Sequence, residues 1–172
     1  MTTVDVSGQL DAEDAPEFIE RIVLDEDADS VTFEDISDEY NWLEIYVEAM
    51  ISGTDNATEV RPRFNQDTVS DDYESYELEH DDSSTASIYI GGRAFDSRTS
   101  DQKNNAFIFK VEGYSNSNFV TTYRTISTLP EGTRGRIWQG WWDNTDVVTQ
   151  IELNPDDEQF AEGSEFILMG FK

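Results

Sequence analysis

The chain has 172 residues, no cysteine and one histidine, and its 38 acidic side chains outnumber the 11 basic ones to give a formal net charge of −27. This acidity argues against a nucleic-acid binder, which neutralises phosphates with basic side chains. The length suits one domain, and 37% hydrophobic with 12% aromatic residues excludes general disorder. No run approaches the ~18 apolar residues of a membrane span, and the N-terminus lacks a leader pattern, so we expect a soluble, non-exported protein without a membrane partner.

Acidic residues occur along nearly the whole chain, whereas lysine occurs only as Lys103, Lys110 and Lys172. Dispersed acid with little lysine indicates adaptation to molar salt, because at roughly 1 M the Debye length is about 3 Å and most self-repulsion disappears. The composition resembles that of proteins from salt-loving archaea. DNA mimicry is the rival explanation, but these carboxylates alternate with apolar positions on many short segments and do not follow one rod-like face.

The first 16 residues contain few large apolar groups and end in proline, so we expect an arm outside the core that docks on a neighbouring subunit. Residues 17–172 are predicted to form a single domain without an internal repeat. Its first segment, Ala15–Leu24, places Phe18, Ile19, Ile22 and Val23 at helical spacing. Their β-branched content favours a strand over a helix.

The dominant period after this segment is two residues, which is typical of half-buried strands. Val31 and Phe33 share one face of a predicted strand, and Leu43, Ile45 and Val47 share a face of the next. Further strands are predicted at Glu59–Phe64, Tyr73–Leu78, Ala86–Ile90, Ala106–Val111, Phe119–Ile126, Arg134–Trp142, Val147–Leu153 and Glu165–Phe171. About ten short strands separated by turn residues predict an all-β protein, a single jelly-roll-like β-sandwich.

Residues for catalysis are scarce. His80 is the single histidine, and it lies between acidic residues at a predicted exposed strand end, which makes it a poor candidate for a catalytic base. Without cysteine the chain has no thiol nucleophile, thiolate zinc site or disulfide, and no phosphate-binding or dinucleotide-binding glycine motif is present. We therefore expect no enzymatic activity, no catalytic residue, no cofactor and no metal.

Two weaker patterns concern ligands of the surface. Asp25–Asp29 begins like a calcium loop, but the sixth residue is Ser30 and the twelfth is Ile36, so a surface turn is the better interpretation. Asn56-Ala57-Thr58 matches the N-glycosylation sequon in a predicted loop. Whether a cation or a glycan is bound stays open.

The densest aromatic stretch is Arg136–Trp142. On a strand, Trp138 and Trp142 share one face and Trp141 points to the other, so one face fills the core and the other is exposed or covered by a partner. We expect these three tryptophans to combine core packing with a subunit or receptor contact. A sugar-stacking platform is the alternative.

Several segments resemble a family of small virion proteins of tailed viruses. These proteins carry an "rFNgDt..nY" segment, matched by Arg63-Phe64-Asn65-Gln66-Asp67-Thr68 with Tyr73 behind it, and an "f..GS.f.LyGi" ending, matched by Phe160–Phe171. Their "sI.F..I...Y..L.l" strand pair is matched from Val31 to Ile45. Gln66 replaces the usual glycine of the family. We interpret the motif residues as structural, since they are of types that shape turns or allow close backbone approach: Asn65, Asp67, Tyr73, Gly163, Ser164 and Gly170.

The resemblance implies a non-enzymatic β-sandwich on the outside of a virion, as head decoration, turret, fibre or tail-tip component. We expect a haloarchaeal tailed-virus protein that assembles in the host cytoplasm, decorates the capsid and meets a high-salt exterior. Its expected partners are itself, as a homotrimer or otherwise a pentamer, other virion proteins such as the capsid protein, and the host surface, but no nucleic acid. A tail-fibre or tail-tip module that recognises host glycans is the alternative, and a cytosolic carbohydrate-binding or hydrolytic protein is a third.

Overall fold

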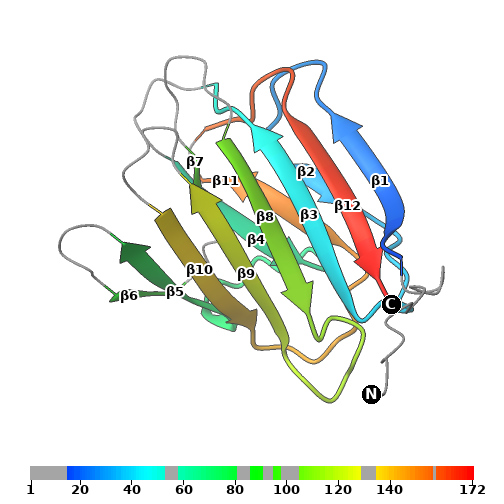
Figure 1. Cartoon of the computed structure of the whole chain (residues 1–172). Coiled ribbons are helices and arrows are strands. Elements are labelled where there is room, and N and C mark those ends of the chain that lie inside the picture. The colour runs from blue at the N-terminus through cyan, green and yellow to red at the C-terminus, as the bar shows by residue number, and fades with distance from the viewer. Residues whose placement is uncertain are drawn as a thin grey trace, which may run out of the picture.

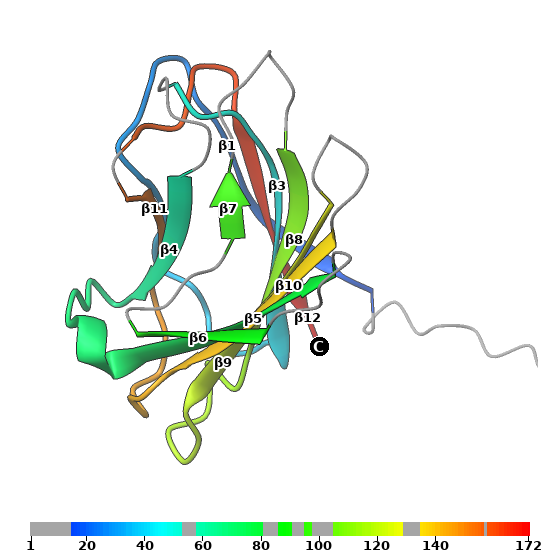
Figure 2. The same ribbon diagram turned by 90° about the vertical axis from the view of Figure 1, so that its left-hand side faces the viewer.

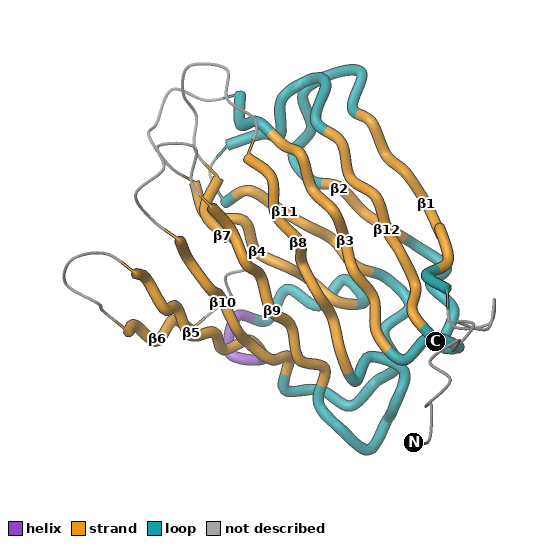
Figure 3. The backbone as a smooth tube through the Cα atoms, viewed as in Figure 1, coloured by secondary structure: helices purple, strands orange, loops and turns teal. Residues whose placement is uncertain are grey.

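The computed structural model describes residues 15–52, 58–80, 86–90, 95–97, 105–128, 135–156 and 158–172. Its strands are β1 (Glu17–Val23), β2 (Val31–Phe33), β3 (Trp42–Ala49), β4 (Thr58–Phe64), β5 (Tyr73–His80), β6 (Ala86–Ile90), β7 (Phe95–Ser97), β8 (Asn105–Glu112), β9 (Thr121–Thr128), β10 (Gly135–Trp142), β11 (Ile151–Pro155) and β12 (Glu165–Phe171). One 3₁₀ turn, η2 (Ser70–Asp72), precedes β5. Figure 3 shows that strands dominate the described chain, so the predicted all-β sandwich is confirmed.

The strands form two antiparallel sheets that face one another (Figures 1 and 2). The eight-stranded sheet has the order β1-β12-β3-β8-β9-β10-β5-β6, and the four-stranded sheet has the order β2-β11-β4-β7. The chain changes sheet at every step from β1 to β12 except from β5 to β6, from β8 to β9 and from β9 to β10, which are antiparallel neighbours in the eight-stranded sheet. The quartets β1-β12-β3-β8 and β2-β11-β4-β7 then have the strand order of a jelly roll, and the other four strands widen only the first sheet.

Alternation along each strand fills the space between the sheets. On β3, Leu43, Ile45 and Val47 are at most 1% exposed, as the two-residue period predicts. Large aromatic side chains occupy the centre, where Phe64 of the small sheet lies 5.6 Å from Trp142 of the large one, measured between ring centroids. Aromatic contacts of this kind join the two sheets.

Predicted and observed strands differ in three places. Val147–Leu153 was expected as one strand, but β11 begins only at Ile151, because the preceding backbone bonds to the side chain of Asn65 instead of to a neighbouring strand. The strand expected from Phe119 begins at Thr121. Strand β7 has three residues, too few to show a period, and was not predicted. In the described part of the chain, no helix has the length and apolar character needed to span a membrane.

Candidate association surface on the eight-stranded sheet

Asn65 fastens the end of β4 to the segment that connects β10 with β11. Its side-chain Oδ1 accepts hydrogen bonds from the backbone N–H groups of Thr149 (2.8 Å) and Gln150 (3.2 Å), and its Nδ2 donates to the carbonyl of Val147 (2.9 Å). Asn65 and Gln66 have φ values of 51° and 62°. Gln66 therefore adopts a left-handed conformation in which glycine costs least, at the position where the family pattern has glycine.

Asp67 and Tyr73 complete this network. The Asp67 carboxylate accepts hydrogen bonds from the indole Nε1 of Trp142 (2.7 Å) and from the backbone N–H of Val69 (2.9 Å). The Tyr73 hydroxyl accepts from the N–H of Phe64 (2.9 Å) and donates to the carbonyl of Asp67 (3.2 Å). Burial raises the pKa of Tyr73. These bonds tie the end of β4 to the start of β5 and to the end of β10.

The C-terminal motif also holds backbone segments together. Ser164 Oγ accepts from the N–H of Met50 (3.1 Å) and donates to its carbonyl (3.3 Å), which ties the start of β12 to the end of β3. Gly163 has φ +85° at the preceding turn. A Cβ on Gly170 would come within 2.5 Å of the Tyr40 ring, so only glycine allows that ring to pack on β12.

The three tryptophans of β10 divide between the two faces of the sheet. Trp138 and Trp142 are 0% and 1% exposed, so the expectation that they contact a subunit or receptor is wrong: they pack between the sheets. Trp141 points outward, half-buried, and its ring centroid lies 5.4 Å from that of Tyr76. Trp141 is therefore the one tryptophan of the three that lies on the outer face of the sheet.

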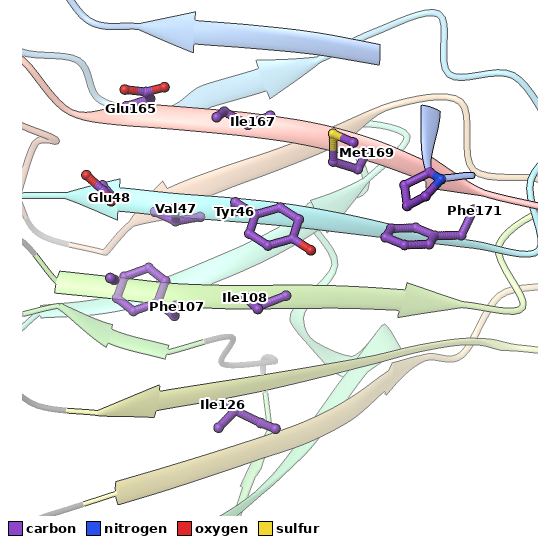
Figure 4. Close-up of a pocket in the computed structure, with 12 residues that line it drawn as sticks. Tyr46, Val47, Glu48, Phe107, Ile108, Ile126, Glu165, Ile167, Met169 and Phe171 are labelled. Carbon is purple, nitrogen blue, oxygen red and sulfur yellow. The ribbon is translucent and has the colours of Figure 1, made fainter. Parts of the chain in front are cut away.

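The outer face of the eight-stranded sheet, which points away from the four-stranded sheet, carries an unusual apolar row. Residues directly opposite one another on β12, β3, β8, β9 and β10 form this row: Ile167, Tyr46, Ile108, Ile126 and Ile137. Figure 4 shows the first four side by side on their strands. Ile126 is 55% exposed and Ile108 is 42% exposed. An exposed apolar row of this length is typical of an interaction surface.

A hollow of about 710 Å³ lies over four of the five residues of this row, from Ile126 on β9 to Ile167 on β12. Met169, Phe171, Glu48 and Glu165 also line it (Figure 4), as does Pro16. Phe171 stacks on Trp42 with 5.0 Å between ring centroids, and Lys110 Nζ lies 4.6 Å from the centroid of the Trp42 ring. The hollow is lined mainly by apolar side chains, and its two carboxylates, Glu48 and Glu165, lie directly opposite one another on β3 and β12.

Charges are few on the central strands of this outer face, whereas β3 and β12 add the outward carboxylates of Glu44, Glu48 and Glu165. The described outward positions of β8, β9 and β10 carry one carboxylate, Glu112, and two cations, Lys110 and Arg124. Lys110 pairs with Glu112 at 2.8 Å, while no described residue forms an ion pair with Arg124. Lys110 and Arg124 are directly opposite one another on β8 and β9. Two like charges at such positions repel and destabilise the strand pair.

Tyr46 connects the apolar row to a charged neighbour. Its hydroxyl donates a 2.9 Å hydrogen bond to the Glu44 carboxylate, and burial together with this carboxylate raises the Tyr46 pKa. The indole Nε1 of Trp42 donates to the other oxygen of Glu44 at 3.3 Å. These bonds hold the aromatic rings against the sheet, and the surface that they present is largely apolar.

The single histidine, the N-glycosylation sequon and the N-terminal arm are the other candidate sites. His80 is the last residue of β5, and the sequon residues Asn56 and Ala57, like residues 1–14 of the expected arm, lie outside the described residues. Within the described ranges, no group of three or more His, Cys, Asp or Glu side chains is placed to hold a metal ion.

No protein-family model matches the chain, and no curated protein sequence is significantly similar to it.

The apolar row was not predicted as a site. Its sequence signal is a strand with apolar residues at consecutive positions, such as Phe107-Ile108-Phe109 and Ile45-Tyr46-Val47. Such runs place apolar groups on both faces of a strand. That Tyr46, Ile108 and Ile126 share one row follows only from the pairing register, which the sequence does not reveal.

Proposed function

We propose that this protein is a non-enzymatic structural protein of a tailed virus that infects a halophilic archaeon, and that it decorates the capsid as a homo-oligomer. The observation that supports self-association best is the exposed apolar row on the outer face of the eight-stranded sheet. A surface row of isoleucines binds nothing by hydrogen bonding and gains free energy only when another surface covers it. The jelly-roll topology and the resemblance of the Asn65 and Gly163 motifs to virion proteins support the viral assignment.

The acidic surface outside the apolar row is compatible with self-association in concentrated salt. At about 1 M salt the Debye length is about 3 Å, so copies with a charge of −27 approach one another with little repulsion. Many copies on one particle then attach it through several contacts at once, and avidity exceeds the affinity of each contact.

The proposal is tested by co-sedimentation of the purified protein with intact particles in molar KCl and by light scattering of the free protein. We expect binding to particles, detected by antibody labelling on the capsid, and a mass above that of one chain. A protein that stays monomeric and fails to label particles overturns the proposal.

A glycan-binding tail module is the second candidate, and two aromatic pairs on the outer face favour it. Trp42 with Phe171 and Tyr76 with Trp141 lie on either side of the polar residues of β8 and β9, and aromatic rings are the usual stacking partners of sugars. Binding of the isolated protein to host cells, competed by soluble surface glycans and lost in Trp141→Ala, supports this candidate over capsid decoration.

A further inference from the structure

We infer that the outer face of the eight-stranded sheet is covered by the same face of a second copy of this chain, so that two sandwiches pack sheet against sheet about a two-fold axis. This pairing rests on the proposed self-association and specifies its surface and symmetry. The expected trimer or pentamer needs a different kind of contact, in which two unlike patches meet.

Exposed apolar side chains gather on this one face. The large apolar residues with the greatest exposure in the described chain include seven on the outer face: Phe18, Val23, Tyr46, Tyr76, Ile108, Ile126 and Ile137. The two others, Val69 and Phe119, lie in loops. Chance would scatter exposed apolar residues singly, which is normal for a protein surface and requires no partner. Their concentration here indicates a surface that is buried in the working assembly.

The charge distribution favours a second copy over an acidic or a basic partner. Two chains of −27 repel one another least where carboxylates are scarce, and the centre of this face, with Lys110, Arg124 and Glu112, is such a place. Arg124 has no ion-pair partner among the described residues. In a paired assembly it can meet Glu44 or Glu112 of the other copy, in addition to the bonds that these carboxylates accept within their own chain.

The size of the face matches what a stable dimer buries. Eight strands spaced ~4.8 Å apart, each about seven residues long with a rise of ~3.3 Å, cover about 800 Å². A standard protein interface buries about 800 Å² per partner. Two sheets packed face to face lie about 10 Å apart with interdigitated side chains, so such a dimer repeats the internal packing of the sandwich.

Symmetry follows from the shape of the apolar row. The row crosses five adjacent strands at one level, from Ile167 on β12 to Ile137 on β10. A two-fold axis that lies in the plane of the interface superimposes the row on its own copy. Such a contact is self-complementary and closes as a dimer, or as an even-numbered assembly if a second contact is added.

Sedimentation velocity in molar KCl tests the pairing on Ile126→Glu and on the double variant Ile108→Glu/Ile126→Glu. Val69→Glu is the matched control, because Val69 is 54% exposed and Ile126 is 55% exposed, but Val69 lies in a loop. Circular dichroism and the midpoint of urea unfolding confirm that each variant is folded, and Ile126→Thr replaces Ile126→Glu if that variant is not. We expect a dimer for wild type and Val69→Glu, and a dissociation constant raised by at least about 100-fold in the double variant.

Single-cysteine variants locate the contact, because the chain has no cysteine of its own. A short thiol crosslinker should join Ile108→Cys or Ile126→Cys chains into dimers and leave Val69→Cys chains single. A dimer that survives the face substitutions, or that is lost only when residues 1–14 are deleted, overturns this pairing while the proposed virion role stands. A wild-type chain that is monomeric and does not bind particles removes both.

Discussion

The outward faces of the two sheets differ sharply although both belong to one sandwich. On the four-stranded sheet, Arg63 pairs with Glu152 at 3.1 Å and Arg61 pairs with Asp156 at 2.5 Å, while Thr32 and Asn154 complete the described outward positions of β2 and β11. On the eight-stranded sheet, isoleucines occupy the corresponding outward positions of three adjacent strands. One outward face is therefore polar and ion-paired, and the other is largely apolar at its centre.

The two outward faces differ in the kind of side chain that fills their exposed strand positions. An acidic chain with 38 carboxylates could have put glutamate at any exposed strand position, and on much of its surface it does. The centre of the eight-stranded sheet keeps apolar groups that cost solubility, because exposed apolar surface promotes association. If the outer face of the eight-stranded sheet binds another molecule, substitutions there should change association, and substitutions on the outward face of the four-stranded sheet should not.

Alkaline titration should distinguish the tyrosines of the outer face from those of the interior. We expect the largest effect here, because ionisation of the interior tyrosines should unfold the whole protein. Burial raises the pKa of Tyr123 and raises that of Tyr114 to about 12, whereas Tyr46 lies on the outer face. A raised tyrosine pKa stabilises the folded state fully below pH 10, the ordinary value, and this contribution is lost as pH rises to about 12. We expect ultraviolet absorbance to report exposed tyrosines first and cooperative ionisation with unfolding between pH 10 and 12.

In the absence of unfolding, full ionisation of all seven tyrosines near pH 10 would contradict the dry interior. The control is Ile126→Thr, which adds no charge beside Tyr46 and leaves the interior intact. If the outer face is buried in a dimer that this variant weakens, the first absorbance change should occur at lower pH in the variant than in wild type, because Tyr46 is then exposed.

Removal of the Asn65 side chain should lower the free energy of unfolding by about 3 kcal/mol. The substitution leaves backbone groups of the 147–150 segment unpaired, and it places alanine, which has no side-chain hydrogen bond to offset the strain, at φ 51°. Asn65→Ala and Asn65→Asp, which keeps the accepting oxygen, are compared by urea unfolding in molar KCl. We expect Asp to retain more stability than Ala. A loss below about 0.5 kcal/mol for Ala would show that this network does not fix the two sheets relative to each other.

Features that depend on neighbouring residues in the sequence could be predicted, and features that depend on the pairing of distant strands could not. Alternation at Leu43, Ile45 and Val47 fixed the inward side of β3 correctly because it is a local property. The distinction between Trp141 and the buried Trp138 and Trp142 also follows from alternation, but the buried side could not be chosen without the opposing sheet. The apolar row depends on the register of five strands, and register is set by long-range pairing and turn length.

Salt should strengthen association through the outer face. Repulsion between two chains of charge −27 falls as the Debye length shrinks from about 10 Å at 0.1 M salt to about 3 Å at 1 M. Salt weakens an apolar contact little, because that contact has little electrostatic attraction to screen. We expect the dissociation constant to fall by about tenfold or more, about 1.4 kcal/mol, over this range. Fluorescence-detected sedimentation gives the constant, with circular dichroism to confirm folding at each salt concentration. An interface held by ion pairs would loosen instead.

The smallest effect is expected on the face of the four-stranded sheet. Arg63 and Glu152 are partly exposed, with side chains 35% and 20% accessible, and exposed pairs contribute about 0–1 kcal/mol before screening. A double-mutant cycle with Arg63→Gln and Glu152→Gln should give a coupling below about 0.5 kcal/mol in molar KCl, and neither variant should change the oligomeric state. A larger coupling, or dissociation of the dimer, would mean that this face also takes part in assembly. Its ion pairs would then be contacts of the particle, because pairs that only face solvent have little left to contribute once salt has screened them.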